Sequence, residues 1–176
     1  MFSFWLQALV LLPTLYFKAQ SPYKGKFESM ETVHGDEETL FEYNLKLVGR
    51  QRLVNGTIIH HVDLDEDYEI WIDIWILKNG NWTPNNISLR HKPCHFMKNI
   101  FASYFEPSLL DSNVPKGDDK CPFRKGEYYV KNVELNTESW SIFINRGLNK
   151  WCVSIKRNGK VVGGLTVVMD LVDRGT

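Results

Sequence analysis

The stretch Tyr68-Glu69-Ile70-Trp71-Ile72-Asp73-Ile74-Trp75-Ile76-Leu77 decides the fold class of this chain. Isoleucine occupies every even-numbered position from 70 to 76, and acidic residues and tryptophans occupy the odd positions between them. Successive side chains of a β-strand point to opposite faces of the sheet, so the four isoleucines share one face. A face of this kind belongs in a core. The stretch therefore predicts a strand that covers one side of a hydrophobic interior.

Short runs with the composition of β-strands lie on both sides of this stretch. They occupy residues 40–48, 51–54, 57–64, 82–89, 126–135, 140–143, 151–156 and 161–172. Asn55-Gly56, Asn79-Gly80 and Asn158-Gly159 each predict a hairpin turn, because such turns need residues that tolerate positive φ angles. Gly163-Gly164 indicates a bulge or a bend in the last run. Residues 21–38 are interpreted as a polar, charged segment that precedes the first strand.

One helix is predicted at residues 94–105, bounded by Pro93 and Pro107. Its apolar residues recur at helical spacing and form a stripe that consists of Phe96, Met97, Ile100, Phe101, Tyr104 and Phe105. Six to eight short strands with a single helix predict a mainly β fold. We expect a two-sheet β-sandwich or β-cup with one short helix after residue 93.

The first 19 residues predict a secretory signal peptide, because a short apolar run is followed by small and polar residues. A membrane-spanning helix needs about 20 apolar residues, and no later segment reaches that length, so we expect no transmembrane segment in the mature chain. Residues 20–176 are then expected to form a single secreted, extracellular domain. The sequence has 21 basic and 21 acidic residues, a balance that argues against a nucleic-acid partner.

The cysteines and N-glycosylation sequons agree with an extracellular location. Two of the three cysteines should be bridged outside the cell, and sequence alone leaves three pairings open. We favour Cys94–Cys121, since Cys94 opens the predicted helix and Cys121 opens a Cys-Pro turn. Cys152 is then expected to be a buried free thiol. The sequons predict glycans at Asn55, Asn81 and Asn86, although Pro84 makes the Asn81 sequon a poor acceptor.

No motif of a known catalytic or cofactor-binding site occurs, so we expect neither enzymatic activity nor a cofactor. The pair His60-His61 is a poor chelate because adjacent side chains on a strand point to opposite faces. The series of acids at residues 63, 65 and 67 resembles the start of a calcium loop, but Tyr68 stands where its turn glycine belongs. We therefore expect no metal site.

The chain is rich in aromatic residues, with 6 Trp, 10 Phe and 7 Tyr. A filled core explains such residues first. Tryptophan and tyrosine also line apolar pockets, where they combine a hydrophobic body with a polar atom. Periodicity alone favours the filled core, and it leaves a ligand-binding pocket open as the alternative.

Residues 50–172 resemble the insect chemosensory B group of small secreted proteins, which are related to the ganglioside activator and the wider ML-type lipid-recognition fold. The motifs that carry the resemblance are Cys94 with Phe96, Cys121-Pro122 with the run 125–133, Trp140, Arg146-Gly147-Leu148 and the hairpin at 159–163. The chain departs from the wider family in having only three cysteines. It also has Asn145 and Ser141 where proline is frequent in the family.

The resemblance implies two separated β-sheets that enclose an apolar cavity, with the helix near its rim. It also implies an apolar, lipid-like ligand and a role in chemosensation, as a pheromone or contact (taste) response. The expected ligand-binding residues are Ile70, Ile72, Ile74, Phe96, Phe101, Tyr104 and Trp140. The alternative is an extracellular accessory protein that has a filled core and binds a membrane receptor or channel through its surface.

Overall fold

The computed structural model describes residues 23–138, 140 and 144–175. The predicted signal peptide (residues 1–19) lies outside these residues, as do residues 141–143 of the predicted run 140–143. The described residues form eight strands and one main helix, which confirms the predicted mainly β fold class. The strands are β1 Tyr23–Val33, β2 Phe41–Val48, β3 Leu53–His60, β4 Glu69–Lys78, β5 Asn81–His91, β6 Gly126–Val133, β7 Gly147–Arg157 and β8 Lys160–Asp173.

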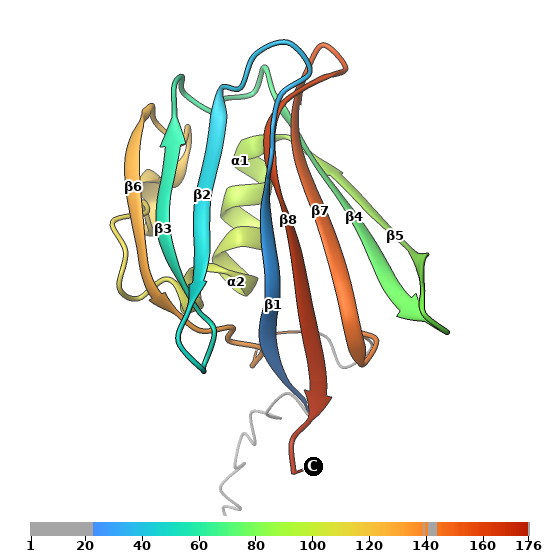
Figure 1. Cartoon of the computed structure of the whole chain (residues 1–176). Helices are drawn as coiled ribbons and strands as arrows, with labels where there is room; N and C mark the ends of the chain where they lie inside the picture. Colours follow the sequence, from blue (N-terminus) through green and yellow to red (C-terminus); the bar gives the residue numbers. More distant parts are fainter. Residues whose placement is uncertain (1–22, 139, 141–143, 176) are drawn as a thin grey trace, which may run out of the picture.

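The strands divide into two groups, which meet where β2 approaches β8 and β1. One group has the order β2-β3-β6, and the other has the order β5-β4-β7-β8 with β1 paired to the free side of β8. Only one residue pair, Phe41 with Gly163, joins β2 to β8. Figure 1 shows the two groups diverging from this junction, with the helix behind the space between them. The fold is a cup rather than a flat sheet.

The helix follows β5 and contains a wide turn. It runs through α1 Pro93–His95, a π-helical segment Phe96–Phe101 and α2 Ala102–Tyr104. The amide of Ala102 donates to the carbonyl of Met97, five residues earlier, which is the π-helical pattern. Short 3₁₀ turns follow at Glu106–Ser108 and Gly117–Lys120. None of the helices in the described part of the chain is long and apolar enough to cross a membrane.

The alternating stretch forms β4 and behaves as predicted. All four isoleucines of this strand are buried, and no more than 7% of the surface of any one of these residues is exposed. The turns at Asn79-Gly80 and Asn158-Gly159 are confirmed, since they connect β4 to β5 and β7 to β8. The predicted irregularity at Gly163 is also confirmed, because the β7–β8 register shifts beside it.

Two predictions about the first third of the chain are wrong. Residues 21–38 are not merely a polar segment, because β1 spans Tyr23–Val33 and pairs with β8 along its length. Asn55-Gly56 is not a hairpin turn, because both residues lie inside β3. The β2–β3 turn comes earlier, where the amide of Arg52 donates to the carbonyl of Gly49. Gly56 lies instead at a bulge, where the register of β3 against β6 shifts.

Candidate functional site

An apolar cavity of about 210 Å³ lies between the two groups of strands and the helix. Every strand except β5 contributes to its wall, as do the helix and the turn that follows it. The lining residues are Phe27, Met30, Tyr43, Leu45, Val54, Ile58, Leu64, Ile70, Ile72, Phe96, Met97, Phe101, Phe105, Ser108, Leu109, Val114, Phe123, Val130, Val133, Leu135, Trp151, Val153, Ile155, Leu165, Val167 and Met169. No histidine, carboxylate or basic side chain is among these described residues.

Four of the seven predicted ligand-binding residues line this cavity. Ile70 and Ile72 contribute from β4, and Phe96 and Phe101 contribute from the helix. The other three predicted residues, Ile74, Tyr104 and Trp140, are not part of the wall. They lie around a different residue that the sequence did not single out, Trp151 of β7, which does line the cavity.

Trp151 lines the cavity and packs against residues outside the wall. The indole of Trp140 stacks on it with 5.1 Å between ring centroids, and Ile74 is its partner in the β4–β7 register. The Trp140 indole N–H donates to the carbonyl of Tyr104 at 3.2 Å. Trp140 is buried. The three predicted residues outside the wall are thus connected to Trp151, Ile74 and Trp140 directly and Tyr104 through its hydrogen bond with Trp140.

The wide turn of the helix explains why Tyr104 is not among the residues that line the cavity. In a regular α-helix, residues 96, 100 and 104 share one face. The π-helical segment adds one residue to a turn, so the wall is formed by Phe96, Phe101 and Phe105, at spacings of five and four. Sequence periodicity cannot show this, because the apolar stripe fits an uninterrupted α-helix equally well.

Beside the cavity, His60 of β3 occupies an aromatic cage. Its ring centroid lies 4.9 Å from that of Phe41 and 4.3 Å from that of Phe123, and only 1% of the residue is exposed. Neither ring nitrogen has a hydrogen-bonding partner among the described residues. Burial is the main cause that lowers the pKa of His60 to about 4, with a smaller contribution from the neighbouring charge of His61. The backbone of Phe123 raises this pKa by more than the charge of His61 lowers it, but by less than burial lowers it. His60 is therefore neutral at pH 7.

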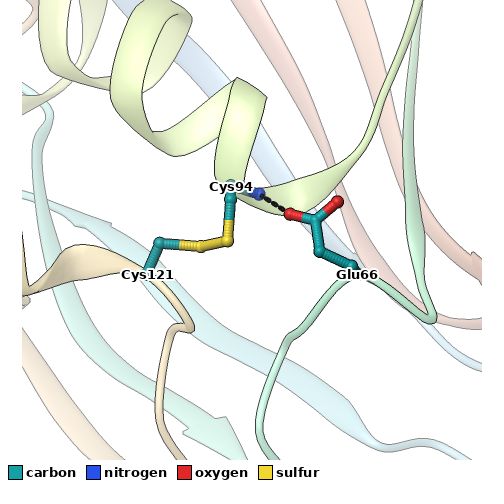
Figure 2. Close-up of side chains that lie close together, drawn as sticks. All are labelled: Glu66, Cys94 and Cys121. Atoms are coloured by element: carbon teal, nitrogen blue, oxygen red, sulfur yellow. Dashed lines mark hydrogen bonds between the residues drawn. A yellow bond between two sulfur atoms is a disulfide. The ribbon is translucent and has the colours of Figure 1, made fainter.

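The start of the helix is fixed at two points. Figure 2 shows the Cys94–Cys121 disulfide, which confirms the favoured pairing, and the Glu66 carboxylate that accepts a hydrogen bond from the Cys94 amide at 3.0 Å. The three side chains lie close enough together to suggest a metal site. Both sulfur atoms are already bonded to each other, and Glu66 accepts the otherwise free amide of a helix terminus. The cluster is therefore a structural anchor.

Two acids between β3 and β4, Asp63 and Asp65, accept hydrogen bonds from neighbouring residues. Asp63 accepts from the Lys125 amide at 2.7 Å and the Arg124 guanidinium at 2.8 Å. The amide bond contributes most to the lowered pKa of this carboxyl, and Arg124 adds to it. Asp65 accepts from the amide of Asp67 at 3.0 Å, as in a turn. These acids therefore hold the connection between β3 and β4.

The three sequon asparagines differ in their surroundings. Asn86 is exposed and has a φ of 53°, at a bulge of β5. Asn81 is also exposed, at the start of the same strand. Asn55 is half-buried in β3, and its side-chain oxygen accepts from the amide of Asn132 at 3.3 Å.

The outer face of β4, β5 and β7 carries an aromatic and cationic surface. Arg90 and Lys156 lie over the ring of Trp71 at 4.1 and 3.7 Å from its centroid. Lys150 lies over Trp82 at 4.8 Å and over Trp75 at 5.5 Å. We call these six residues the outer tryptophan face. Cys152 belongs to the same face by its register with Asp73, and it is a free thiol that is half-buried, not fully buried as predicted.

Comparison with known proteins adds one finding. A family model described as "Protein of unknown function (DUF1091)" matches residues 70–149. The matched segment begins at the first cavity isoleucine of β4 and contains the helix, both bridged cysteines and Trp140. It therefore covers one wall of the cavity and the elements that support it. No curated protein matches the chain.

Proposed function

We propose that this protein is a secreted, non-enzymatic binding protein for an apolar, lipid-like ligand, which it holds in the cavity between its two groups of strands. The observation that carries the proposal is the lining of that cavity, which is almost entirely hydrocarbon and aromatic. An unfilled cavity lowers the stability of a fold, because the atoms that line it lack van der Waals contacts on one side. Among the described residues, the wall carries no histidine, carboxylate or amine, which supports binding over catalysis.

The cavity volume sets the size of the guest. An apolar cavity of about 150 Å³ in another protein accommodates benzene. By proportion, a cavity of about 210 Å³ accommodates about eight non-hydrogen atoms. Three methionines line the wall, Met30, Met97 and Met169. Methionine is flexible and adapts to irregular shapes, so the cavity can expand to admit a longer alkyl chain.

The expected affinity follows from the buried area. Burial of eight methylene-sized groups contributes ~6 kcal/mol at ~0.8 kcal/mol each. Immobilisation of the ligand and of the wall reduces this value. We therefore expect dissociation constants of about 0.1–1 mM for guests of this size and micromolar values for longer chains. Such a ligand would suit a chemosensory signal, as a pheromone or contact stimulus, which is the role that the family resemblance suggests.

Quenching of tryptophan fluorescence by bromobenzene tests the proposal, because bromine quenches at contact and Trp151 lines the cavity. We expect a saturable quenching phase in the wild type. Val167 lines the cavity, whereas the next residue, Val168, lies on the opposite face of β8. The variant Val167→Phe fills the cavity and should lose the saturable phase, and Val168→Phe should retain it. A folded wild type without saturable quenching, or equal behaviour of the two variants, rejects the proposal.

A second candidate function is that of an extracellular accessory protein that binds a membrane receptor or channel. The outer tryptophan face favours it, because tryptophan and arginine are enriched in protein interfaces. Its three cations Arg90, Lys150 and Lys156 outnumber its two acids, Glu69 and Asp73, so the fitting partner has an acidic surface.

The two candidates are separated by binding of labelled protein to receptor-bearing cells. The double variant Lys150→Glu/Lys156→Glu should abolish saturable binding if the outer tryptophan face is the interface. The matched control Lys24→Glu/Lys26→Glu makes the same charge change on β1. Loss of binding in Val167→Phe instead would place the activity in the cavity.

A further inference from the structure

The wall of the cavity carries two hydroxyl groups among the described residues, those of Tyr43 and Ser108. Ser108 is engaged, because its oxygen accepts from the amide of Asn136 at 3.0 Å. The hydroxyl of Tyr43 has no partner in the described part of the chain. The bond that joins this residue to β1 is made by its backbone carbonyl, which accepts from the Thr32 hydroxyl, and does not involve the phenol. Tyr43 is thus the lining hydroxyl for which the described residues provide neither a donor nor an acceptor.

Tyr43 is half-buried, and its side chain forms part of the wall of the apolar cavity. Burial raises the pKa of the phenol well above its usual value, so the group is a neutral O–H donor. The side chain lies on the inner face of β2, and its ring is 6.5 Å from that of His60, centroid to centroid. An unpaired hydroxyl in an apolar site is costly. A water molecule there would need two to four polar partners, and this wall offers few.

The indole N–H of Trp151 also has no partner, but it does not compete for this role. The atom is enclosed by neighbouring side chains, whereas the ring itself forms part of the wall. Tyr43 is therefore the group that can meet an atom of a guest. A hydrogen-bond acceptor on the guest would satisfy it, and the remaining wall requires that the rest of the guest be apolar.

We infer that the cavity selects small apolar molecules that carry one oxygen function, such as a ketone, aldehyde, ester or alcohol, whose oxygen accepts a hydrogen bond from the Tyr43 hydroxyl. The inference rests on the proposed function and specifies its ligand class. Plain hydrocarbons enter the same cavity but leave the hydroxyl unpaired. Charged head groups are excluded, because the described lining offers no opposite charge.

The test uses two probes of the same shape, acetophenone and α-methylstyrene, in which a carbonyl oxygen replaces a terminal methylene. Binding is followed by NMR of the methyl groups of Ile70, Ile72 and Val167, which line the cavity. The variant Tyr43→Phe removes the single oxygen atom. The control Tyr129→Phe makes the same change at an exposed position of β6, where 49% of the residue surface is accessible.

We expect Tyr43→Phe to weaken acetophenone binding about three- to tenfold, the range for one neutral hydrogen bond. Binding of α-methylstyrene should be unchanged or tighter, and Tyr129→Phe should alter neither. If both probes shift the cavity methyls and Tyr43→Phe affects them equally, the oxygen anchor is wrong and the proposed function stands. If neither probe shifts the methyls of the folded protein, the proposed function fails and this inference with it.

Discussion

At the scale of single residues, His60 makes the free energy of unfolding depend on pH. Its folded pKa of about 4 lies below the value of 6.5 for an exposed histidine. Between these values the unfolded chain binds more protons than the folded chain, so acid favours unfolding. The contribution of His60 to stability is complete above about pH 6.5 and is lost progressively as the pH falls towards 4.

We expect the free energy of unfolding of the wild type to fall by about 2 kcal/mol between pH 7.5 and pH 5 through this residue. The variant His60→Phe keeps an aromatic ring in the cage of Phe41 and Phe123 and should remove that part of the slope. Urea unfolding at both pH values measures it. His95→Gln changes an exposed histidine and should keep the wild-type slope. An unchanged slope in His60→Phe would show that His60 is solvated in the folded state.

Asn86 is the sequon asparagine whose surroundings best suit a glycan. It is exposed at a bulge of β5, an edge strand whose free side could otherwise pair with another chain. We expect the protein secreted from a glycosylating eukaryotic cell to lose one glycosidase-sensitive mobility step in the variant Asn86→Gln. Asn81→Gln should lose none, because Pro84 follows that sequon. A full set of mobility steps in Asn86→Gln would contradict the assignment.

At the scale of elements, the disulfide stabilises the helix that forms one wall of the cavity. It joins residues 27 positions apart, with 5.3 Å between their Cα atoms. Closing a loop of this length stabilises the fold by about 3–4 kcal/mol in the chain-entropy treatment. The double variant Cys94→Ala/Cys121→Ala should lose that amount, as measured by urea unfolding. Cys152→Ala, which removes the half-buried free thiol, should lose less than about 1 kcal/mol. A similar loss in both variants would contradict the prediction.

The contrast between β4 and β1 shows how an inserted residue hides a strand from sequence analysis. In β4 the isoleucine face is unbroken, so its period of two is visible in the sequence. In β1 the register shifts after Phe27, so the inner positions change from odd to even numbers along the strand. The alternation is lost, and the strand resembles a polar segment.

The turn between β2 and β3 was misplaced for a related reason. Asn-Gly indicates positive φ, and Gly56 does have a φ of 147°. A Cβ atom there would lie 2.1 Å from the carbonyl oxygen of Asn44, so glycine is needed for the close approach of two strands. The real turn uses Gly49 together with Arg52, whose φ is 56°. Arginine gives no sequence signal for that conformation.

At the scale of the whole molecule, the cavity could be expected from the family resemblance but its walls could be only partly named. Ile70 and Ile72 followed from strand alternation, and Phe96 and Phe101 followed from the helical stripe. Trp151 was not named, although it shares the apolar face of its strand with Val153 and Ile155, because alternation does not say which residues of an inner face meet the cavity. The walls contributed by β1, β2 and β8 depend on how distant segments meet, which a local pattern does not contain.

The whole cup sets the size of ligand that the cavity accepts, and a substitution at one wall residue should change that size. Phe101 lines the cavity from the helix and is only partly buried by other side chains. The variant Phe101→Leu removes part of the ring, which enlarges the cavity at a cost of about 1–2 kcal/mol in stability. In a series of 2-alkanones of increasing length, the tightest-binding member should therefore be longer for the variant than for the wild type.

Competition against bromobenzene quenching measures this series, with thermal unfolding to confirm that the variant is folded. Ile74→Val provides the control, because it removes one methyl from a buried residue of β4 that lies outside the wall. It should lower stability by about 1 kcal/mol and leave the preferred chain length unchanged. If the preferred length is the same in the wild type and in Phe101→Leu, ligand size is not set by the space between the strands and the helix. The alkyl chain would then have to extend out of the cup.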